Sequence, residues 1–183
     1  MAYANKVIRN PQTGQQIRFL QTNADTGGEL LEMESTFQPH STEPVPHYHP
    51  RQSEDFRVLS GELTVRLGDR TTVLKAGETL HLPARAVHSM WNDSGQPAVV
   101  NWRVQPAGAT EHFLETAMGL AADGKVSAGG MPPLLQTALL VTHFSGVFRL
   151  VRPPFWVQQV VFTVLSPVAR LAGYRPFYRQ YFE

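Results

Sequence analysis

Histidines are unevenly distributed along the chain, and four of the seven lie between residues 40 and 81. Two of them, His47 and His49, are separated by one residue. Side chains alternate across an extended strand, so both imidazoles would point to the same side. Glu54 and His88 each lie in phase with the apolar residues of a later predicted strand. Three neutral imidazoles and one carboxylate suit a divalent first-row metal ion and leave coordination positions for water or substrate.

Composition narrows what such a site can contain. The chain has no cysteine among its 183 residues, which excludes disulfides, thiolate nucleophiles, iron–sulfur clusters and cysteine-type zinc sites. Any metal must therefore be held by nitrogen and oxygen. The 16 Lys and Arg against 15 Asp and Glu give a net charge of +1, and we predict no nucleic-acid partner. Residues 134–183 differ from the rest, because they carry five arginines and one acidic residue, Glu183.

The first 105 residues are typical of antiparallel β structure. Roughly ten short segments of alternating apolar and polar residues are separated by turn sequences such as Asn10-Pro11-Gln12-Thr13-Gly14 and Gly68-Asp69-Arg70. Strands are expected over 16–21, 29–37, 56–58, 63–67, 72–75, 80–82, 87–92 and 98–104. This number of strands is enough to close a small barrel. We predict a β-barrel domain over residues 1–108.

The pattern changes to a helical one after Pro106. Residues 110–122 have apolar positions at helical spacing, with Thr110 as the expected N-cap. Two further helices are predicted over Leu134–Val151 and Phe155–Ala172, separated by prolines. No run reaches the roughly 18 uninterrupted apolar residues of a membrane span. The first residues have no apolar run of signal-peptide length, so a cytoplasmic location is predicted.

At this point the sequence resembles the cupin superfamily, specifically the small single-barrel cupins of the cupin-2 type. The resemblance is carried by two motifs. The first consists of His47, His49, Glu54 and Gly61, and the second of Gly77, Pro83, His88 and Asn92. Two positions depart from the family pattern, since Ser41 and Arg85 stand where glycines are expected. Neither departure removes a ligand, but both put the local turn geometry in question.

The resemblance implies an all-β fold, a double-stranded β-helix or jelly-roll barrel, with a C-terminal helical extension over residues 109–183. It also implies that His47, His49, Glu54 and His88 bind a divalent metal ion, which could be Fe, Mn, Ni or Zn. The function expected is that of a metal-dependent oxygenase, dioxygenase-like, or isomerase acting on a small organic substrate. The alternative is a non-catalytic sensor or small-ligand-binding module with a structural metal. Fold alone does not choose between them.

Other residues are candidates for the substrate pocket. Those expected near the metal are Phe56, Arg85, Met90, Asn92 and Trp102. Arg85, at the expected barrel mouth, would attract an anionic substrate. His40 and His81 are out of phase with the ligands and are not expected to bind the metal.

Three hypotheses remain for the last part of this extension, residues 134–183. Its helices could pack across the barrel or onto a second subunit, giving a homodimer. They could instead lie on an anionic membrane as peripheral helices, because the segment combines Phe155 and Trp156 with five arginines and one acid. The third hypothesis is that the extension holds an unrelated protein partner.

Overall fold

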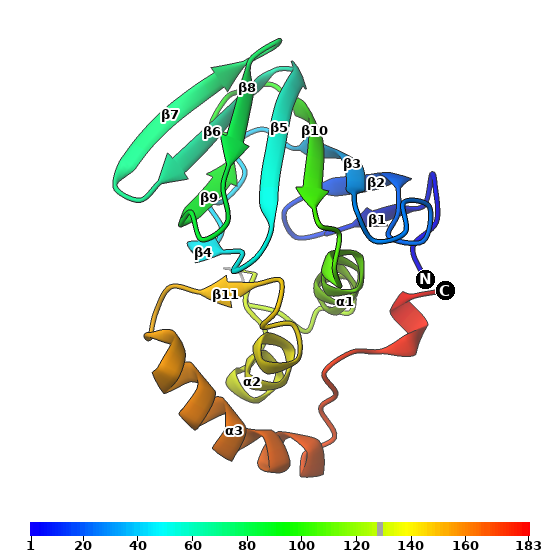
Figure 1. Ribbon diagram of the computed structural model, residues 1–183, viewed down its shortest axis with the longest axis vertical. Coiled ribbons are helices and arrows are strands. Elements are labelled where there is room, and N and C mark those ends of the chain that lie inside the picture. Colours follow the sequence, from blue (N-terminus) through cyan, green and yellow to red (C-terminus); the bar gives the residue numbers. More distant parts are fainter. Residues whose placement is uncertain (128–129) are drawn as a thin grey trace.

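The computed structural model describes residues 1–127 and 130–183 and contains two antiparallel sheets with helices beneath them (Figure 1). The six-stranded sheet has the order β1-β2-β3-β10-β5-β8, and the five-stranded sheet the order β11-β4-β9-β6-β7. The strands are β1 (Val7–Arg9), β2 (Gln16–Gln21), β3 (Leu31–Phe37), β4 (His47–Tyr48), β5 (Ser53–Ser60), β6 (Glu62–Leu67), β7 (Arg70–Lys75), β8 (Thr79–Leu82), β9 (His88–Trp91), β10 (Ala98–Gln105) and β11 (Arg149–Leu150). The helices are α1 (Thr110–Ala122), α2 (Leu134–His143), α3 (Phe155–Leu171) and the short 3-10 helix η1 (Arg179–Tyr181).

Alternation of apolar and polar residues produces the strands as predicted. In β3 every second side chain from Leu31 to Phe37 is buried and the intervening ones are half-buried. The same alternation places Glu54, Phe56 and Val58 of β5 on the buried face of the sheet. The site residue Glu54 is therefore directed inward by the period of the strand that carries it.

Two apolar clusters hold the sheets in place. One is formed between the two sheets and includes Phe56, Val58, Leu63 and Val65. The other lies between the first strands and helix α1, and includes Phe19, Leu31 and Met33 from the strands with Leu114 and Met118 from the helix. The arrangement is an antiparallel β-sandwich with helices added. Closure of the two sheets into a barrel stays a prediction.

Helix α1 begins and ends where the sequence predicts, but its first residue has another role. The N-cap is Ala109, which makes no side-chain capping bond, so the prediction that Thr110 caps the helix was wrong. Thr110 is buried and its hydroxyl accepts a hydrogen bond of 2.8 Å from the side-chain amide of Gln52. The same amide group donates to the carbonyls of Pro106 and Ala107. The hydroxyl is used to anchor the start of β5 to the helix.

The prediction of one helix over Leu134–Val151 was also wrong. Helix α2 ends at His143, and the chain turns through Ser145 and Gly146 before β11 pairs antiparallel with β4. In that pairing Leu150 lies opposite His47 and Arg149 opposite Tyr48. The free edge of β4 offers backbone partners that a continued helix could not satisfy. The third predicted helix is confirmed, because α3 spans Phe155–Leu171.

The helical extension therefore contacts the sheets through β11 as well as through α1, while α3 forms the outermost layer of the molecule (Figure 1). Its inner face packs on α2, where Phe162 meets Ala138, Val141 and Leu150. A domain boundary at residues 108 and 109 stays a prediction. In the part of the chain that the structure describes, no helix has the length and apolar character needed to cross a membrane.

Candidate metal centre

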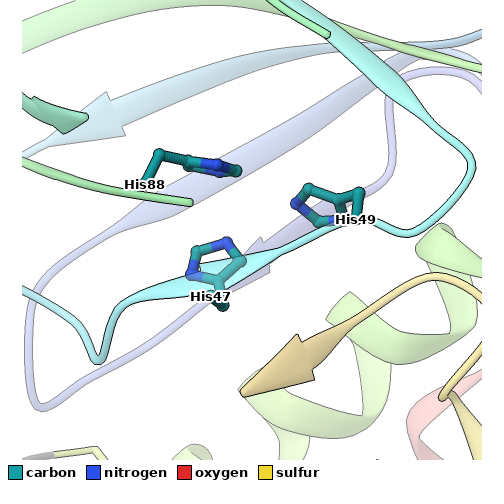
Figure 2. Close-up of side chains that lie close together, drawn as sticks. All are labelled: His47, His49 and His88. Carbon is teal, nitrogen blue, oxygen red and sulfur yellow. The ribbon is translucent and has the colours of Figure 1, made fainter. Parts of the chain in front are cut away.

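Three histidines converge at the end of the sandwich that faces the helices. His47 lies in β4 and is paired with His88 of β9, while His49 follows β4 directly. Each offers one ring nitrogen, and these nitrogens lie within 4.8 Å of one another. Figure 2 shows the three rings arranged around a common space. The spacing of two residues between His47 and His49 thus has the predicted consequence, since both rings reach the same site.

Each ring is oriented by a hydrogen bond on the side away from that space. Backbone carbonyls can only accept, so a ring nitrogen bonded to one carries a proton, and in the neutral ring the lone pair is then on Nε2. In all three rings the nitrogen on a carbonyl is Nδ1. The pairs are His47 with Val45 at 3.1 Å, His49 with Val147 at 2.5 Å and His88 with Ala86 at 3.0 Å. The three Nε2 atoms are therefore prepared to bind a cation.

Glu54 completes the cluster from β5. Its Oε2 lies 3.3 Å from Nε2 of His49 and 3.0 Å from Nε2 of His88. Its Oε1 accepts a hydrogen bond of 3.0 Å from the indole Nε1 of Trp102. Despite their proximity, Oε2 of Glu54 and Nε2 of His49 are buried and neither has a hydrogen-bond partner.

Facing lone pairs at this distance repel unless a proton or a cation lies between them. Three imidazole nitrogens and a carboxylate oxygen are ligands that a divalent first-row metal ion accepts. The unpartnered atoms of His49 and Glu54 thus fit such an ion. The identity of the ion is not set by this ligand set, because Fe, Mn, Ni and Zn all accept it.

Burial and neighbouring charges shift the pKa values of these groups in different directions, so the rings do not share one protonation state. Burial, followed by the neighbouring rings of His88 and His49, lowers the pKa of His47 to about 3, so this ring is neutral at physiological pH. Burial raises the pKa of the Glu54 carboxyl, but the His49 and His88 rings outweigh it and the net pKa is lowered. Burial likewise opposes protonation of His49, yet the Glu54 carboxylate raises its pKa overall. The carboxylate is the negative charge that attracts a cation to this place.

A cavity of about 240 Å³ opens beside the four residues. Apolar and aromatic side chains form most of its wall, including Phe56, Met90 and Trp102, which the sequence placed in the pocket, and Phe37, Ile17, Phe113, Leu114, Met118 and Phe148. Helix α1 supplies one side of this wall and the segment before β11 another. A concave apolar space beside a few polar groups is the usual form of a small-molecule site.

Arg85 and Asn92 are not among the residues that line this cavity. Asn92 is fully buried, and its amide bonds the carbonyls of Phe37 and Gln96. Its backbone exchanges hydrogen bonds with Ser41, whose hydroxyl accepts from Asn92 N at 2.9 Å and whose N–H donates to Asn92 O. Ser41, in place of the motif glycine, thus helps hold the loop onto β9.

Arg85 has a backbone conformation that favours glycine. Its φ is +71°, in the left-handed region that glycine adopts without strain. Its backbone N–H donates to the carbonyl of His49 at 2.8 Å, so the turn contacts the metal-site segment through main chain alone. Arg85 thus adopts the positive φ that favours glycine, and the turn still bonds the segment that carries His49.

A larger hollow, about 550 Å³, lies on the outer face of the six-stranded sheet. Charged side chains line it, among them Asp55, Arg57, His81 and Arg103. His81 bonds Asp55 at 2.7 Å and does not belong to the histidine cluster. We place the site at the smaller cavity, because it alone of these two contains converging metal-ligating groups.

Sequence reasoning missed the contribution of residues 147 and 148. Val147 supplies the carbonyl that orients His49, and the Phe148 ring stacks on His47 with centroids 4.8 Å apart. Phe148 also stacks on Phe113 at 4.6 Å. The one available signal was the Ser145-Gly146 pair, which weakens the predicted helix at this point. The element that follows could not be located from it.

Fold and site together define an antiparallel β-sandwich protein with a three-histidine centre at one end. Residues 33–104 match the family described as Cupin domain. A predicted oxalate decarboxylase from Thermotoga maritima has a similar fold, with a TM-score of 0.50 and 17% identity over 56% of this chain and 92% of that one. The chain therefore contains a cupin domain over residues 33–104.

Two curated proteins are similar in sequence. An oxidoreductase from Arthrobotrys oligospora is 30% identical over 156 residues, covering 75% of this chain and 59% of that protein. Quercetin 2,3-dioxygenase from Bacillus subtilis is 32% identical over 105 residues, covering 57% of this chain and 30% of the dioxygenase. The chain therefore spans less than two thirds of either relative.

Proposed function

We propose that this cupin is a metal-dependent oxidoreductase, dioxygenase-like, that acts on a small and largely apolar organic molecule. The metal ligands in this proposal are His47, His49, His88 and Glu54. The observation that carries it is the convergence of three Nε2 lone pairs, each with its tautomer fixed by a carbonyl, beside a buried carboxylate and an apolar cavity. The sequence similarity to an oxidoreductase and to a dioxygenase supports this reaction class over the isomerase that the sequence left open.

The cavity wall supports an uncharged substrate. Among the residues that the structure describes as lining it, none is a lysine or an arginine. Phe56, Trp102, Phe113 and Phe148 present aromatic surface instead. Beyond the metal ion itself, no cationic side chain of this wall would compensate the charge of an anionic substrate. We therefore propose a neutral molecule with aromatic or aliphatic surface, in place of the anionic substrate suggested by Arg85.

The protein groups prepare the site in three ways. Carbonyls of Val45, Ala86 and Val147 fix the rings. Trp102 fixes Glu54 by donating to Oε1, which leaves Oε2 directed at the histidines. The stacked rings of Phe113 and Phe148 remove water from the side of the cavity nearest His47. A bound divalent metal would supply Lewis-acid or redox chemistry at this place.

Metal content is the first test. The purified protein, reconstituted separately with Fe(II), Mn(II), Ni(II) and Zn(II), is expected to retain one ion per chain, measured by mass spectrometry after desalting. The double substitution His47→Ala with His49→Ala should abolish retention. His81→Ala is the matched control, because this histidine lies outside the cluster, and it should retain the ion. Equal retention in the double variant would show that the ligands are assigned wrongly.

Turnover is the second test. The Fe(II)-loaded protein should consume dioxygen in the presence of a neutral aromatic substrate, and no product should form under anaerobic conditions. Metal retention and ligand binding without turnover of any compound in such a screen would favour the non-catalytic binding module. A homodimer and a cytoplasmic location remain parts of the proposal, to be tested by sedimentation and by cell fractionation.

A further inference from the structure

The outer face of α3 carries an exposed apolar surface. Six large apolar side chains are between 41% and 90% exposed: Trp156 (70%), Val160 (61%), Val161 (41%), Val164 (69%), Val168 (53%) and Leu171 (90%). Most of them recur at spacings of three and four residues, so they share one side of the helix. Isolated exposed apolar residues need no explanation, but a continuous row of this length does.

The opposite side of α3 is already used for packing. Gln158, Phe162 and Ala169 are buried there. The Gln158 amide donates to the carbonyls of Leu150 and Pro153, which fixes the rotation of the helix about its axis. The apolar row therefore cannot turn inward without breaking this packing. In Figure 1 α3 is the outermost element, with no other element covering its outer side.

The charged side chains that flank α3 along the chain are arginines. Residues 134–183 contain five arginines and a single acidic residue, Glu183. Arg152 precedes α3, Arg170 lies in its last turn and Arg175 follows it, and all three are exposed. None of these three forms an ion pair with another residue in the described parts of the chain. Arg170 continues a polar strip with Gln159 and Thr163 along one flank of the apolar row.

We propose that α3 is a peripheral membrane-binding helix that lies in the plane of an anionic lipid surface. The apolar row would enter the boundary between headgroups and acyl chains, and the arginines would bind lipid phosphates and carboxylates. Trp156, in the first turn, is a residue type that prefers this boundary. A second copy of the same face would bring arginines against arginines, so charge favours an anionic surface over self-association. This inference does not depend on the metal centre.

Vesicle sedimentation tests the proposal on the full chain. The protein should sediment with vesicles that contain phosphatidylglycerol, and little should sediment with phosphatidylcholine alone. Raising the salt concentration should weaken the binding, since screening shortens the reach of the arginines. Val160→Ser with Val164→Ser should weaken the partition coefficient by about tenfold or more. The control is Leu59→Ser with Val73→Ser, two exposed apolar residues of β5 and β7, which should bind as the unmodified protein does.

A charge variant separates loss of binding from loss of folding. Arg152→Gln with Arg170→Gln removes two exposed cations without touching the core, and should weaken binding to anionic vesicles roughly 30-fold. Arg9→Gln with Arg70→Gln should leave it unchanged. Brominated lipids should quench tryptophan fluorescence in the unmodified protein, and Trp156→Phe should remove that quenching.

Three results of the vesicle experiments would overturn the proposal. They are equal binding to neutral and anionic vesicles, no effect of the arginine substitutions in a folded protein, and quenching that persists in Trp156→Phe. A dimer in sedimentation velocity that Val160→Ser with Val164→Ser dissociates would also overturn it, because the row would then be a subunit interface.

Discussion

The imidazole of His49 donates its Nδ1 proton to the carbonyl oxygen of Val147, a residue 98 positions further along the chain. The matched cupin domain ends at residue 104, so this contact comes from outside it. The residues that follow Val147 make two further contacts with the site. Phe148 stacks on His47, and β11 pairs with β4. The extension thus orients one candidate ligand and covers another. We infer that the candidate metal centre is completed by the extension.

Phe148→Ala tests this coupling. Loss of the ring removes its contacts with His47 and Phe113, and loosens the segment that holds the Val147 carbonyl. Loss of a residue that orients a metal ligand typically lowers metal affinity 10- to 100-fold. We expect Phe148→Ala to lower the affinity roughly tenfold. Isothermal titration with Zn(II) measures it, on protein shown by circular dichroism to be folded. Phe177→Ala, in the exposed part of the extension, should have no effect, and equal affinities for the two variants would contradict the inference.

Trp102→Phe tests the support of Glu54. Phenylalanine keeps the aromatic surface but cannot donate to Oε1, which would leave a buried carboxylate oxygen without its partner. The metal-free protein should lose about 1–3 kcal/mol of unfolding free energy in urea. Metal affinity should fall about tenfold, because the carboxylate is no longer held toward the histidines.

The control for this substitution is Trp91→Phe. The Trp91 ring lies over the Arg66 guanidinium, 5.4 Å from it, and does not line the cavity. Its replacement should leave metal affinity unchanged. If both tryptophan variants bound the metal alike, Trp102 would be a packing residue and Glu54 would be positioned by other means.

Local patterns in the sequence predicted most of what builds the site. Alternation placed His47 with His49 and directed Glu54 inward, and the turn residues separated the strands at nearly the observed positions. Side-chain direction and strand boundaries depend on residues that are close in sequence, and the two-residue period of a strand predicts them well. The resemblance to cupins was predicted from the same residues, and the match of residues 33–104 to the cupin domain confirms it for that part of the chain.

Long-range contacts could not be predicted in this way. The apolar run from Leu134 onward satisfies a helical period, and only pairing with β4, a tertiary contact, makes Arg149 and Leu150 a strand. Thr110 has the side chain of an N-cap, but the distant Gln52 amide uses its hydroxyl. In both cases a partner far along the chain outweighs the local preference.

Glu43 gives the protein an acid-sensitive contact beside the site. Its carboxylate receives two hydrogen bonds from Arg66, at 2.7 and 2.9 Å, and one from Ser89. The bond from Arg66 lowers the Glu43 pKa below its ordinary value, with Ser89 adding to the effect. A lowered pKa in the folded state contributes stability that is present above the unfolded pKa and is lost as pH falls through the folded pKa.

Glu43→Gln should therefore destabilise the protein at neutral pH and much less at low pH. Because both side chains are partly exposed, we expect a loss of about 1 kcal/mol or less at neutral pH. Urea unfolding of the two proteins from neutral pH down to about pH 3 measures the difference. A difference that stays constant over this range would show that the Glu43 charge does not contribute.

Arg85→Gly should stabilise the fold. Arg85 holds φ at +71°, where a side chain is strained and glycine is not. Its own side chain is exposed, so little packing is lost. Relief of strain, offset in part by the greater freedom of glycine when unfolded, should add about 0.5–1 kcal/mol to the unfolding free energy. Thermal unfolding should show a Tm higher by a few degrees. A lower Tm would mean that the Arg85 side chain makes stabilising contacts.

Gly61 and Gly77, one from each of the two motifs, are glycines for different physical reasons. Both have positive φ, +75° and +91°. A Cβ at Gly61 would lie 2.3 Å from the carbonyl oxygen of Pro97 and 2.8 Å from Cα of Ala98, whereas a Cβ at Gly77 meets nothing within 4 Å. Gly77→Ala therefore introduces backbone strain alone and should cost about 1 kcal/mol. Gly61→Ala adds a collision with main chain, so we expect about 3 kcal/mol or more, measured by urea unfolding of both variants. Equal losses would mean that the strand end at Pro97 moves aside freely, and that the close approach of β5 and β10 does not require glycine.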